Sequence, residues 1–572
     1  MKRADAIAIA GVFCVALALR LVYLQQVESL PFFEFPLIDA RSYDEWAQAI
    51  AAGDWLGDKI FYQAPAYPYF LGVIYSVFGH DPLVAHIVQM VMGAGSCVLL
   101  LVATRSLFGL RSAVAAGLLL AAYAPALFFD GIIQKTSLGL FLTSALIALV
   151  AQLAKRPGAG AAALAGAVAG LLALTRENAL ILALVIPAWL LLRHRGAALR
   201  GRAVWAAAFV LGLAVVLLPV GARNLAVGDT FVITTSQLGP NFYIGNNPKA
   251  TGLYAPLMPG RHTPDFEGRD ATRAAEWETG RELLPGEVSN HWLGKSLEWI
   301  SEEPLAFLRL LFEKILYTLN DYEIPDTEDI HVHAEFSWLL AGLHSIFRFG
   351  VLLPLALAGL VFAWREREPG GASELVATLA VVFTAAVAIF YVWARYRFPL
   401  VPMLVPFAGL AIVRSYETAS RGAWRRLAAP TAALVVGAFV SNLTLFDREV
   451  LSQTAWVNLA NIMLREQRLE EADSYLERAT AIDHETADLH FHLASLRFRQ
   501  DRPETEHHLR RMLSLDPTDF RGHLLLARVL KAEGRSAEAS RHLREAIRLD
   551  PGRTRRGRPG APIPVPERER NP

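Results

Sequence analysis

The sequence predicts an all-α protein: a polytopic membrane domain with about eleven transmembrane helices, followed by a C-terminal α-solenoid of helical repeats. Of the 572 residues, 53% are hydrophobic and only 19% are charged, whereas soluble domains usually carry about 25% charged residues. The apolar residues fall into blocks of about 18–25, the length at which a helix crosses about 30 Å of hydrocarbon. After residue 445, a period of 33 to 34 residues replaces these blocks.

The apolar blocks set the topology of the membrane domain. The first block ends without a small-residue cleavage site, so we expect a retained helix rather than a signal peptide. Lys and Arg concentrate in alternate connections, which predicts a cytoplasmic N-terminus. The outer face then receives loops 27–83 and 223–345 and everything after residue 443. The blocks lie near residues 5–26, 84–104, 112–128, 132–153, 158–175, 178–193, 203–222, 346–364, 375–392, 398–414 and 426–442.

Net charge, cysteine positions and composition indicate which partners and which cellular location to expect. The net charge of +1 gives no indication of a nucleic-acid partner, so none is expected. Both cysteines, Cys14 and Cys97, fall inside predicted membrane helices, which leaves no disulfide framework. The high content of Ala, Arg and Gly is typical of a bacterial protein. We therefore expect a multi-pass protein of the bacterial inner membrane whose outer face is extracytoplasmic.

The C-terminal region repeats a short pattern. Leu459-Ala460, Leu493-Ala494 and Leu526-Ala527 recur 34 and 33 residues apart, and each of two later helix pairs ends in Leu-Asp-Pro. This pattern resembles about three tetratricopeptide repeats (TPR), over residues 446–552. Such solenoids usually bind a protein partner, and a self-contained helical cap is the alternative. The tail 553–572, rich in Arg, Pro and Glu, predicts disorder.

Carboxylates cluster where the chain first leaves the membrane. Asp39, Asp44 and Glu45 follow the first apolar block, and Asp130 lies in the next outer turn. A membrane enzyme would place a catalytic acid or base here, and Asp39 is the main candidate. Each residue also has a structural alternative, because Asp39 and Asp130 suit helix N-caps and the other two suit a solvated helix face.

Four cations lie on the same predicted face, where the positive-inside rule disfavours them. Lys135, Arg176, Arg395 and Arg397 all stand at or near helix ends. Ionisable groups at such depth are costly and commonly functional, and several cations together would bind the phosphate of a lipid substrate. The alternatives are an interfacial ion pair of Arg176 with Glu177 and snorkelling of the other three side chains to phospholipid head groups.

The long outer loop offers two further candidate sites. Tyr243, Asn246 and Asn247 are suited to line a sugar or acceptor site, although a simple turn explains them equally well. His331 and His333 stand in an acidic stretch and could ligate a divalent metal ion, but such alternation is more often solvated surface. We therefore predict neither a metal site nor any other cofactor.

The first outer loop resembles that of the GT-C membrane glycosyltransferases, on the motifs Asp39-x-x-x-Tyr43, Gly53-Asp-Trp55 and Ala64-Pro-Ala-Tyr-Pro-Tyr-Phe70. The similar branch is family 39-like and includes protein mannosyltransferases and aminoarabinose lipid A transferases. The resemblance covers about residues 5–440 and implies a GT-C-like glycosyltransferase domain over 1–445. Looser agreement comes from Gln89, Asp130–Thr136, Leu174–Asn178, Tyr243–Pro248 and Ala394–Pro399.

This resemblance implies a reaction. In the family, an Asp of the first outer loop is the catalytic carboxylate, and Asp39 stands at the matching position. The implied donor is a sugar on polyprenyl phosphate, and the implied acceptor is a protein or a lipid or glycan at the outer face. We expect inverting transfer, with Asp39 as general base and the outer cations stabilising the leaving phosphate. The lipid A transferases have Lys-Pro-Pro where this chain has Gln63-Ala-Pro65, so their donor is not assumed.

Two non-enzymatic interpretations compete with this one: a transporter, and a membrane-anchored TPR scaffold for envelope glycan assembly. Transporters place polar residues near the bilayer midplane, whereas here the helix centres are apolar and the ionisable groups gather at one end. A scaffold would use the repeats but leave Asp39 and the outer arginines without a role. Among enzymes, a ligase or polymerase of polysaccharides would use similar donors.

Overall fold

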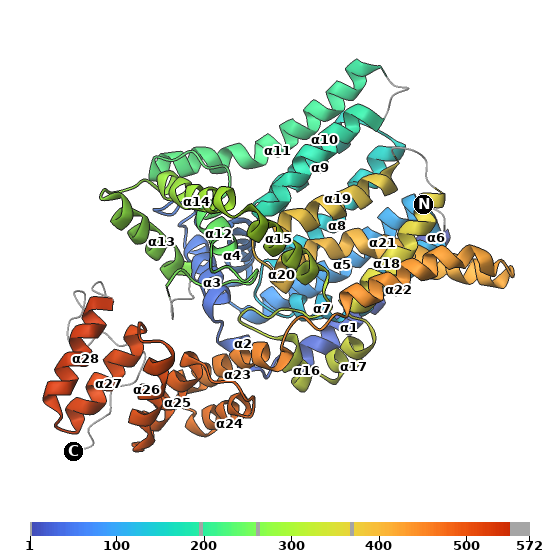
Figure 1. The fold of residues 1–572 in the computed structure, drawn as a ribbon. Helices are drawn as coiled ribbons and strands as arrows, with labels where there is room; N and C mark the ends of the chain where they lie inside the picture. The colour runs from blue at the N-terminus through green and yellow to red at the C-terminus, as the bar shows by residue number, and fades with distance from the viewer. Residues whose placement is uncertain (1–2, 194–197, 259–263, 367–370, 550–572) are drawn as a thin grey trace.

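The computed structural model places residues 3–193, 198–258, 264–366 and 371–549. All regular elements in these ranges are helices, and no strand occurs among them. Figure 1 shows a bundle of long helices with shorter helices at one end and a separate arm of helix pairs formed by the C-terminal part. The predicted all-α class is thus confirmed. The predicted disordered tail lies outside the described residues.

The bundle contains six helical stretches that are long and apolar enough to cross a membrane, and a seventh if the pair bent by 57° between α6 and α7 is one span. The protein is therefore a multipass membrane protein. The six are α1 (Arg3–Val27), α5 (Pro82–Phe108), α8 (Thr136–Lys155), α11 (Leu199–Gly228), α17 with α18 (Trp338–Ile346, Phe349–Arg365), and α20, η2 and α21 (Ala394–Arg397, Phe398–Leu400, Val401–Ser420). The bent pair is α6 (Leu110–Ala122) and α7 (Ala124–Asp130).

Each of the eleven predicted apolar blocks coincides with a helix, but the helices differ in length. The four remaining blocks form helices shorter than a full span, and a further short apolar helix, α4, follows the first outer loop. The short helices are α4 (Ala66–Phe78), α9 (Ala159–Ala173), η1 with α10 (Glu177–Ile181, Leu182–Arg193), α19 (Ala372–Ala388) and α22 (Ala428–Ser441).

Small residues bring helices α9 and α11 into close contact. A Cβ atom on Gly166 would lie 1.9 Å from the carbonyl oxygen of Phe209, and one on Gly212 would lie 1.9 Å from that of Ala163. No side chain fits at either position. Helices in lipid gain little from apolar burial against one another, so close backbone packing of this kind supplies much of their association.

The two ends of the bundle differ in character. At the end that holds the N-terminus, Arg105 pairs with Asp5 at 2.8 Å and Arg414 with Glu366 at 2.7 Å. The opposite end carries the helices of both long outer loops (Figure 1). They are α2 (Pro31–Glu34), α3 (Ile38–Ala51), α12 (Leu238–Gly245), α13 (Pro264–Thr279), α14 (Pro285–Glu302), α15 (Pro304–Leu319) and α16 (Ile330–Phe336).

Three antiparallel helix pairs form the C-terminal arm. The first pair shares one continuous buried apolar cluster with the membrane domain, through Trp456 and Leu459, whereas the later helices have a cluster of their own around Leu509 and Leu526. The repeat domain therefore begins as part of the main core. Its helices are α23 (Arg448–Arg465), α24 (Leu469–Thr480), α25 (Ala487–Arg499), α26 (Glu504–Leu515), α27 (Phe520–Ala532) and α28 (Ser536–Leu549).

Candidate active site

Asp39 lies in the first turn of α3, immediately after a strained residue. Ile38 has a φ of 49°, in the left-handed region that β-branched residues avoid. Such a conformation costs about 1–3 kcal/mol, and tertiary contacts must impose it. Asp39 makes no capping hydrogen bond to the start of α3, where Leu37 is the N-cap residue. The helix-cap alternative for Asp39 is thus wrong, and its carboxylate is directed to other partners.

The carboxylate of Asp39 is the centre of a chain of polar contacts. Its Oδ1 accepts a hydrogen bond from Nε2 of Gln63 at 3.0 Å, and its Oδ2 accepts one from Nη1 of Arg395 at 2.5 Å. The same Nη1 lies 2.8 Å from Oδ2 of Asp326. Arg395 also stacks on the ring of Trp393, with 4.5 Å between the guanidinium carbon and the ring centroid. A buried arginine thus bridges two carboxylates from different outer loops.

A polar pocket of about 440 Å³ opens beside this chain. Three carboxylates, two cations and four aromatic side chains line it, so that it suits a polar ligand. Lys135 is 6% exposed and has no ion-pair partner among the described residues. The lining residues are Ile38, Asp39, Tyr43, Gln63, Lys135, Gln237, Glu267, Asp326, Tyr391, Trp393, Arg395 and Tyr396.

Arg176 lies next to the pocket without lining it, and some of its hydrogen-bond donors have no acceptor. Its Nη2 donates to Oγ1 of Thr136 at 2.8 Å, and its guanidinium lies 5.3 Å from the ring centroid of Tyr396. Its Nε and Nη1 are buried and have no hydrogen-bond partner in the part of the chain that the structure describes. The buried hydroxyl of Tyr43 likewise has none. Buried donors without acceptors are costly, and a ligand with hydrogen-bond acceptors would satisfy them.

The ion pair of Arg176 with Glu177, considered as the structural alternative, is not formed. Glu177 instead accepts hydrogen bonds from Oγ1 of Thr235 at 3.0 Å and from Nε2 of Gln237 at 2.6 Å. These contacts tie the end of the membrane helices to the start of the long outer loop. Arg176 therefore keeps its charge without a neutralising partner.

A second cavity of about 480 Å³ meets the polar pocket at Asp326 and Arg395. Its walls are mainly apolar side chains from α7, the following turn, the loop before α16 and the start of α16, including Phe128, Ile132 and Ile330. One polar and one apolar cavity thus meet at the arginine that holds Asp39. An amphipathic substrate would find matching surroundings on the two sides.

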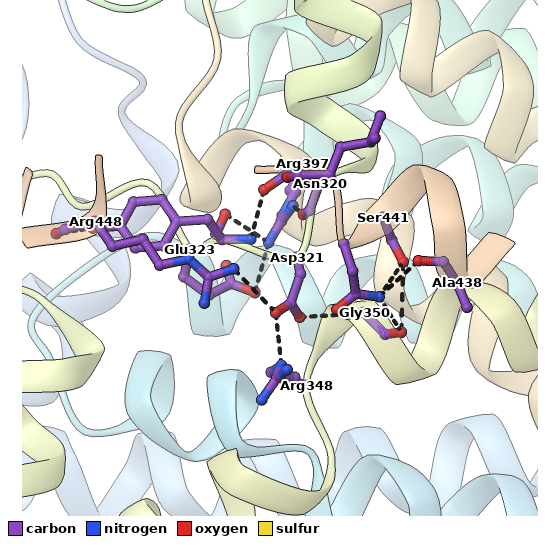
Figure 2. A network of polar contacts seen from close by, with 12 residues as sticks. Asn320, Asp321, Glu323, Arg348, Gly350, Arg397, Ala438, Ser441 and Arg448 are labelled. Carbon is purple, nitrogen blue, oxygen red and sulfur yellow. Dashed lines mark hydrogen bonds and ion pairs between the residues drawn. The ribbon is translucent and has the colours of Figure 1, made fainter. Parts of the chain in front are cut away.

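Arg397 does not line the polar pocket. Its guanidinium pairs with Glu323 at 2.7 Å, donates to backbone carbonyls including that of Asn320, and lies 4.2 Å from the ring centroid of Phe349. Figure 2 shows this network, in which Asp321 also pairs with Arg348. Arg397, which was predicted to bind phosphate, is thus a structural residue, because its guanidinium already contacts Glu323, backbone carbonyls and the ring of Phe349.

The other predicted carboxylates also lie outside the pocket. Asp44 accepts hydrogen bonds from the hydroxyl of Tyr75 at 2.7 Å and from Nε2 of Gln48 at 2.7 Å. Glu45 is exposed and pairs with Arg41 at 2.6 Å. Asp130 forms an ion pair with Arg20 at 2.8 Å in which both side chains are 0% exposed. It therefore joins two membrane helices instead of facing the outer surface.

Tyr243, Asn246 and Asn247 serve the fold of the long loop. The ring of Tyr243 packs on Trp292, with 4.7 Å between centroids. The amide of Asn246 donates to the carbonyl oxygens of Phe242 and Ile389, each at 2.8 Å, and that of Asn247 donates to the carbonyl oxygen of Tyr243 at 2.8 Å. The structure thus brings none of the three to the pocket, and the turn alternative describes their contacts.

The two histidines of the acidic stretch point apart. His333 contacts the hydroxyl of Tyr23 at 3.0 Å through Nδ1 and Glu328 at 2.8 Å through Nε2. His331 stacks on Tyr322 instead. No group of three or more His, Cys, Asp or Glu side chains is placed to hold a metal ion within the described ranges.

Nine of the twelve residues that line the pocket were not among the predicted site residues, including Gln63, Glu267, Asp326 and Tyr391. Gln63 directly precedes the Ala64–Phe70 motif of the first outer loop. Asp326, Glu267 and Tyr391 lie far along the chain, and no local sequence pattern marks them as site residues. Burial raises the pKa of the Glu267 carboxyl from its ordinary 4.5 to about 7; the nearby Asp39 charge acts the same way, and a hydrogen bond from the Tyr254 hydroxyl opposes it. Burial likewise raises the pKa of Asp326, and Arg395 opposes that shift.

Comparison with known families agrees with this architecture. Residues 62–220 match the family model described as dolichyl-phosphate-mannose-protein mannosyltransferase. Residues 453–485 and 520–553 match the tetratricopeptide repeat. The predicted resemblance to this branch of membrane glycosyltransferases, and the prediction of TPR, are thereby confirmed. The first match begins after Asp39 and includes Gln63, Lys135 and Arg176.

Several solved structures are similar at low identity. The apo oligosaccharyltransferase of Archaeoglobus fulgidus is 15% identical, with a TM-score of 0.42, over 82% of this chain and 59% of that one. Apo ArnT from Cupriavidus metallidurans is 18% identical, with a TM-score of 0.43, over 83% and 75%. The chain thus spans 59% of the length of the oligosaccharyltransferase. The search of curated proteins found no match.

Proposed function

We propose that this protein is a membrane glycosyltransferase that moves a sugar from a polyprenyl-phosphate donor to a hydroxyl of a protein, lipid or glycan acceptor. The observation that carries the proposal is the Asp39 carboxylate, fixed by Gln63 and Arg395 at the wall of a polar pocket that also contains Lys135. The match of residues 62–220 to a mannosyltransferase family supports the same class.

Asp39 is suited to act as general base. Each of its oxygens holds one hydrogen bond from the protein, which leaves lone pairs free to accept the hydroxyl proton of an acceptor. A carboxylate is in general a weak base. Proton transfer is therefore late, after the anomeric carbon has gained positive charge and the acceptor oxygen has become acidic.

The donor phosphate is placed at Lys135 and Arg176. Departure of the sugar leaves negative charge on the phosphate, and preorganised cations stabilise such charge without reorganising. Arg176 has two buried donors without acceptors, and Lys135 lacks an ion-pair partner among the described residues. The proposed reaction uses these protein cations and requires no metal ion. The apolar cavity next to the pocket suits the isoprenoid part of the donor.

The proposal places the site on the extracytoplasmic face of a bacterial inner membrane. The helices around Asp39 lie at the end of the bundle opposite the N-terminus, and α23 contacts the same end through Asn458 and Ser452. The repeat domain therefore also lies outside the membrane on that face, where it recruits a protein partner or the acceptor. The rival proposals are a non-catalytic TPR scaffold and a transporter.

The test of the proposal is transfer of label from a pool of polyprenyl-linked sugars by purified protein in native-like membranes. Sugar transfer by the wild-type protein supports the glycosyltransferase proposal. If no transfer occurs with any donor or acceptor fraction, the scaffold proposal is favoured. Uptake of sugar or lipid into sealed vesicles without transfer would favour the transporter.

Replacing Arg176 with Leu is expected to raise the KM for the donor about 10- to 100-fold, because a charge-assisted hydrogen bond contributes about 1.5–3 kcal/mol. The melting temperature should stay the same or rise, since the variant removes a buried charge whose Nε and Nη1 have no partners among the described residues. Donor titrations and thermal unfolding in membranes measure both. Arg156→Leu, an exposed cation beyond the last turn of α8, is the control. Lower stability with an unchanged KM would contradict the assignment.

The pH dependence of the donor KM should report the ionisation of Glu267. Its raised pKa of about 7 means that it is neutral below pH 7 and negative above it, so ionisation places a second anion beside the donor phosphate. A phosphodiester keeps one charge over this range. We expect the donor KM to rise roughly three- to tenfold between pH 6 and pH 8. In Glu267→Gln, the rise should be clearly smaller over the same range, and an undiminished rise would assign the titration to another group, such as Asp326.

A further inference from the structure

The segment between α15 and α16, residues 320–329, forms one wall of the site without forming a helix. It carries Asp326, which pairs with Arg395. An irregular segment lacks the internal hydrogen bonds of a helix, so its buried backbone groups need partners from elsewhere in the fold. The position of Asp326 depends on what supplies them.

The first repeat helix, α23, supplies a partner for one backbone group of the segment and two contacts to its side chains. The Nδ2 of Asn458 donates to the carbonyl oxygen of Thr327 at 2.9 Å, and Oγ of Ser452 donates to Oδ2 of Asp329 at 2.7 Å. The hydroxyl of Tyr322 in turn donates to the carbonyl oxygen of Arg448 at 3.1 Å. Thr327 is 8% exposed and Asp329 only 1% exposed, so water does not replace these bonds easily.

These contacts lie a short distance from the proposed base. Thr327 is the covalent neighbour of Asp326, whose carboxylate lies 2.8 Å from Nη1 of Arg395. The same nitrogen holds Oδ2 of Asp39 at 2.5 Å. A shift of the Thr327 backbone therefore moves Asp326, and Asp326 shares with Asp39 the arginine that orients both. Each link from α23 to Asp39 is a hydrogen bond, an ion pair or a covalent bond.

We infer that α23 of the repeat domain is part of the active-site framework, with Asn458 and Ser452 as positioning residues that hold Asp326 and, through Arg395, Asp39. This inference rests on the proposed function. The repeat domain is thus not an appended module, which agrees with its first helix pair sharing the apolar core of the membrane domain. A ligand that moves α23 would change the rate of transfer.

The test compares Asn458→Leu with Asn461→Leu in the full-length protein in lipid nanodiscs. Asn461 lies on the same helix and is partly buried, and no hydrogen bond of its side chain is found within the described ranges. We expect Asn458→Leu to lower kcat about 10- to 100-fold with the donor KM changed less than threefold, because small misplacements of reacting groups cost rates of this size. Asn461→Leu should keep the wild-type kcat.

A second measurement does not depend on activity. Hydrogen–deuterium exchange of peptides covering 320–329 should speed up in Asn458→Leu and, more weakly, in Ser452→Ala, but not in Asn461→Leu. Faster exchange together with a lower kcat supports the inference. Unchanged exchange, or faster exchange with an unchanged kcat, overturns it. If Asn458→Leu fails to fold, Ser452→Ala carries the same comparison, with the same two outcomes.

The two proposals can fail separately. If the wild-type protein transfers no sugar, the proposed function fails and the kcat comparison with it, while the exchange data still show whether α23 holds residues 320–329. If the wild-type protein is active and Asn458→Leu is equally active, only the role of the repeat domain is overturned.

Discussion

Asp39→Asn is expected to lower sugar transfer by about two to four orders of magnitude, the usual contribution of a positioned general base. The amide has nearly the same shape, but only its oxygen accepts hydrogen bonds, so it keeps the contact with Arg395 or the one with Gln63, and it cannot take the acceptor proton. The donor KM should change little, because Lys135 and Arg176 hold the phosphate in this proposal. Initial rates with one polyprenyl-linked sugar, at equal membrane abundance of the variant and the wild type, measure the effect.

The matched control is Glu45→Gln, which changes an exposed carboxylate of the same helix and should leave transfer within twofold of wild type. Equal transfer by Asp39→Asn and the wild type would remove Asp39 from the mechanism. The next candidates would then be Asp326 and Glu267, which line the same pocket, whereas Asp44 and Asp130 do not.

Breaking the buried Arg20–Asp130 pair is expected to cost about 3–5 kcal/mol of stability, because the remaining partner is left as an uncompensated buried charge. Both side chains are fully buried, and Nε of Arg20 donates to Oδ2 of Asp130 at 2.8 Å. The site is tightly built, since a Cβ atom on Gly93 would lie 2.0 Å from that same oxygen. Arg20→Leu and Asp130→Leu, each unfolded by heat or denaturant in mild detergent, test the prediction.

The double variant is the sharper measurement. Arg20→Leu with Asp130→Leu should recover most of the lost stability, because removing both charges leaves neither of them unpaired. Arg105→Leu is the control, since its pair with Asp5 is 39% and 16% exposed and should contribute little. Additive losses in the double variant would mean that each residue acts through other contacts.

The sequence alone predicted the architecture well because membrane helices and repeats are local features. A block of apolar residues forms a helix in lipid whatever its neighbours are, so each of the eleven blocks coincides with a helix. The number of full spans was less predictable. Glu177–Leu192 and Ala372–Ala388, for example, are apolar but shorter than a span, and where a helix ends depends on its packing.

The site was predicted only in part, and the reason is geometric. Asp39, Lys135 and Arg395 were identified from residue type and position, and the structure brings them to one pocket. Arg397 is also an arginine and lies only two residues from Arg395, yet it pairs with Glu323 away from the pocket. Residues two apart on a helical turn point to opposite sides, so the rotation of α20 against its neighbours decides which arginine faces the ligand.

By itself the sequence determined the membrane domain, the TPR period and the position of a candidate carboxylate just after the first membrane helix, since these follow from local composition and spacing. Only the tertiary structure decided that Asp326, Glu267 and Gln63 join Asp39, and that α23 supports the wall of the site. Such contacts join segments far apart in the chain. Their partners are selected by packing and by the need to satisfy buried polar groups, and neither leaves a local pattern in the sequence.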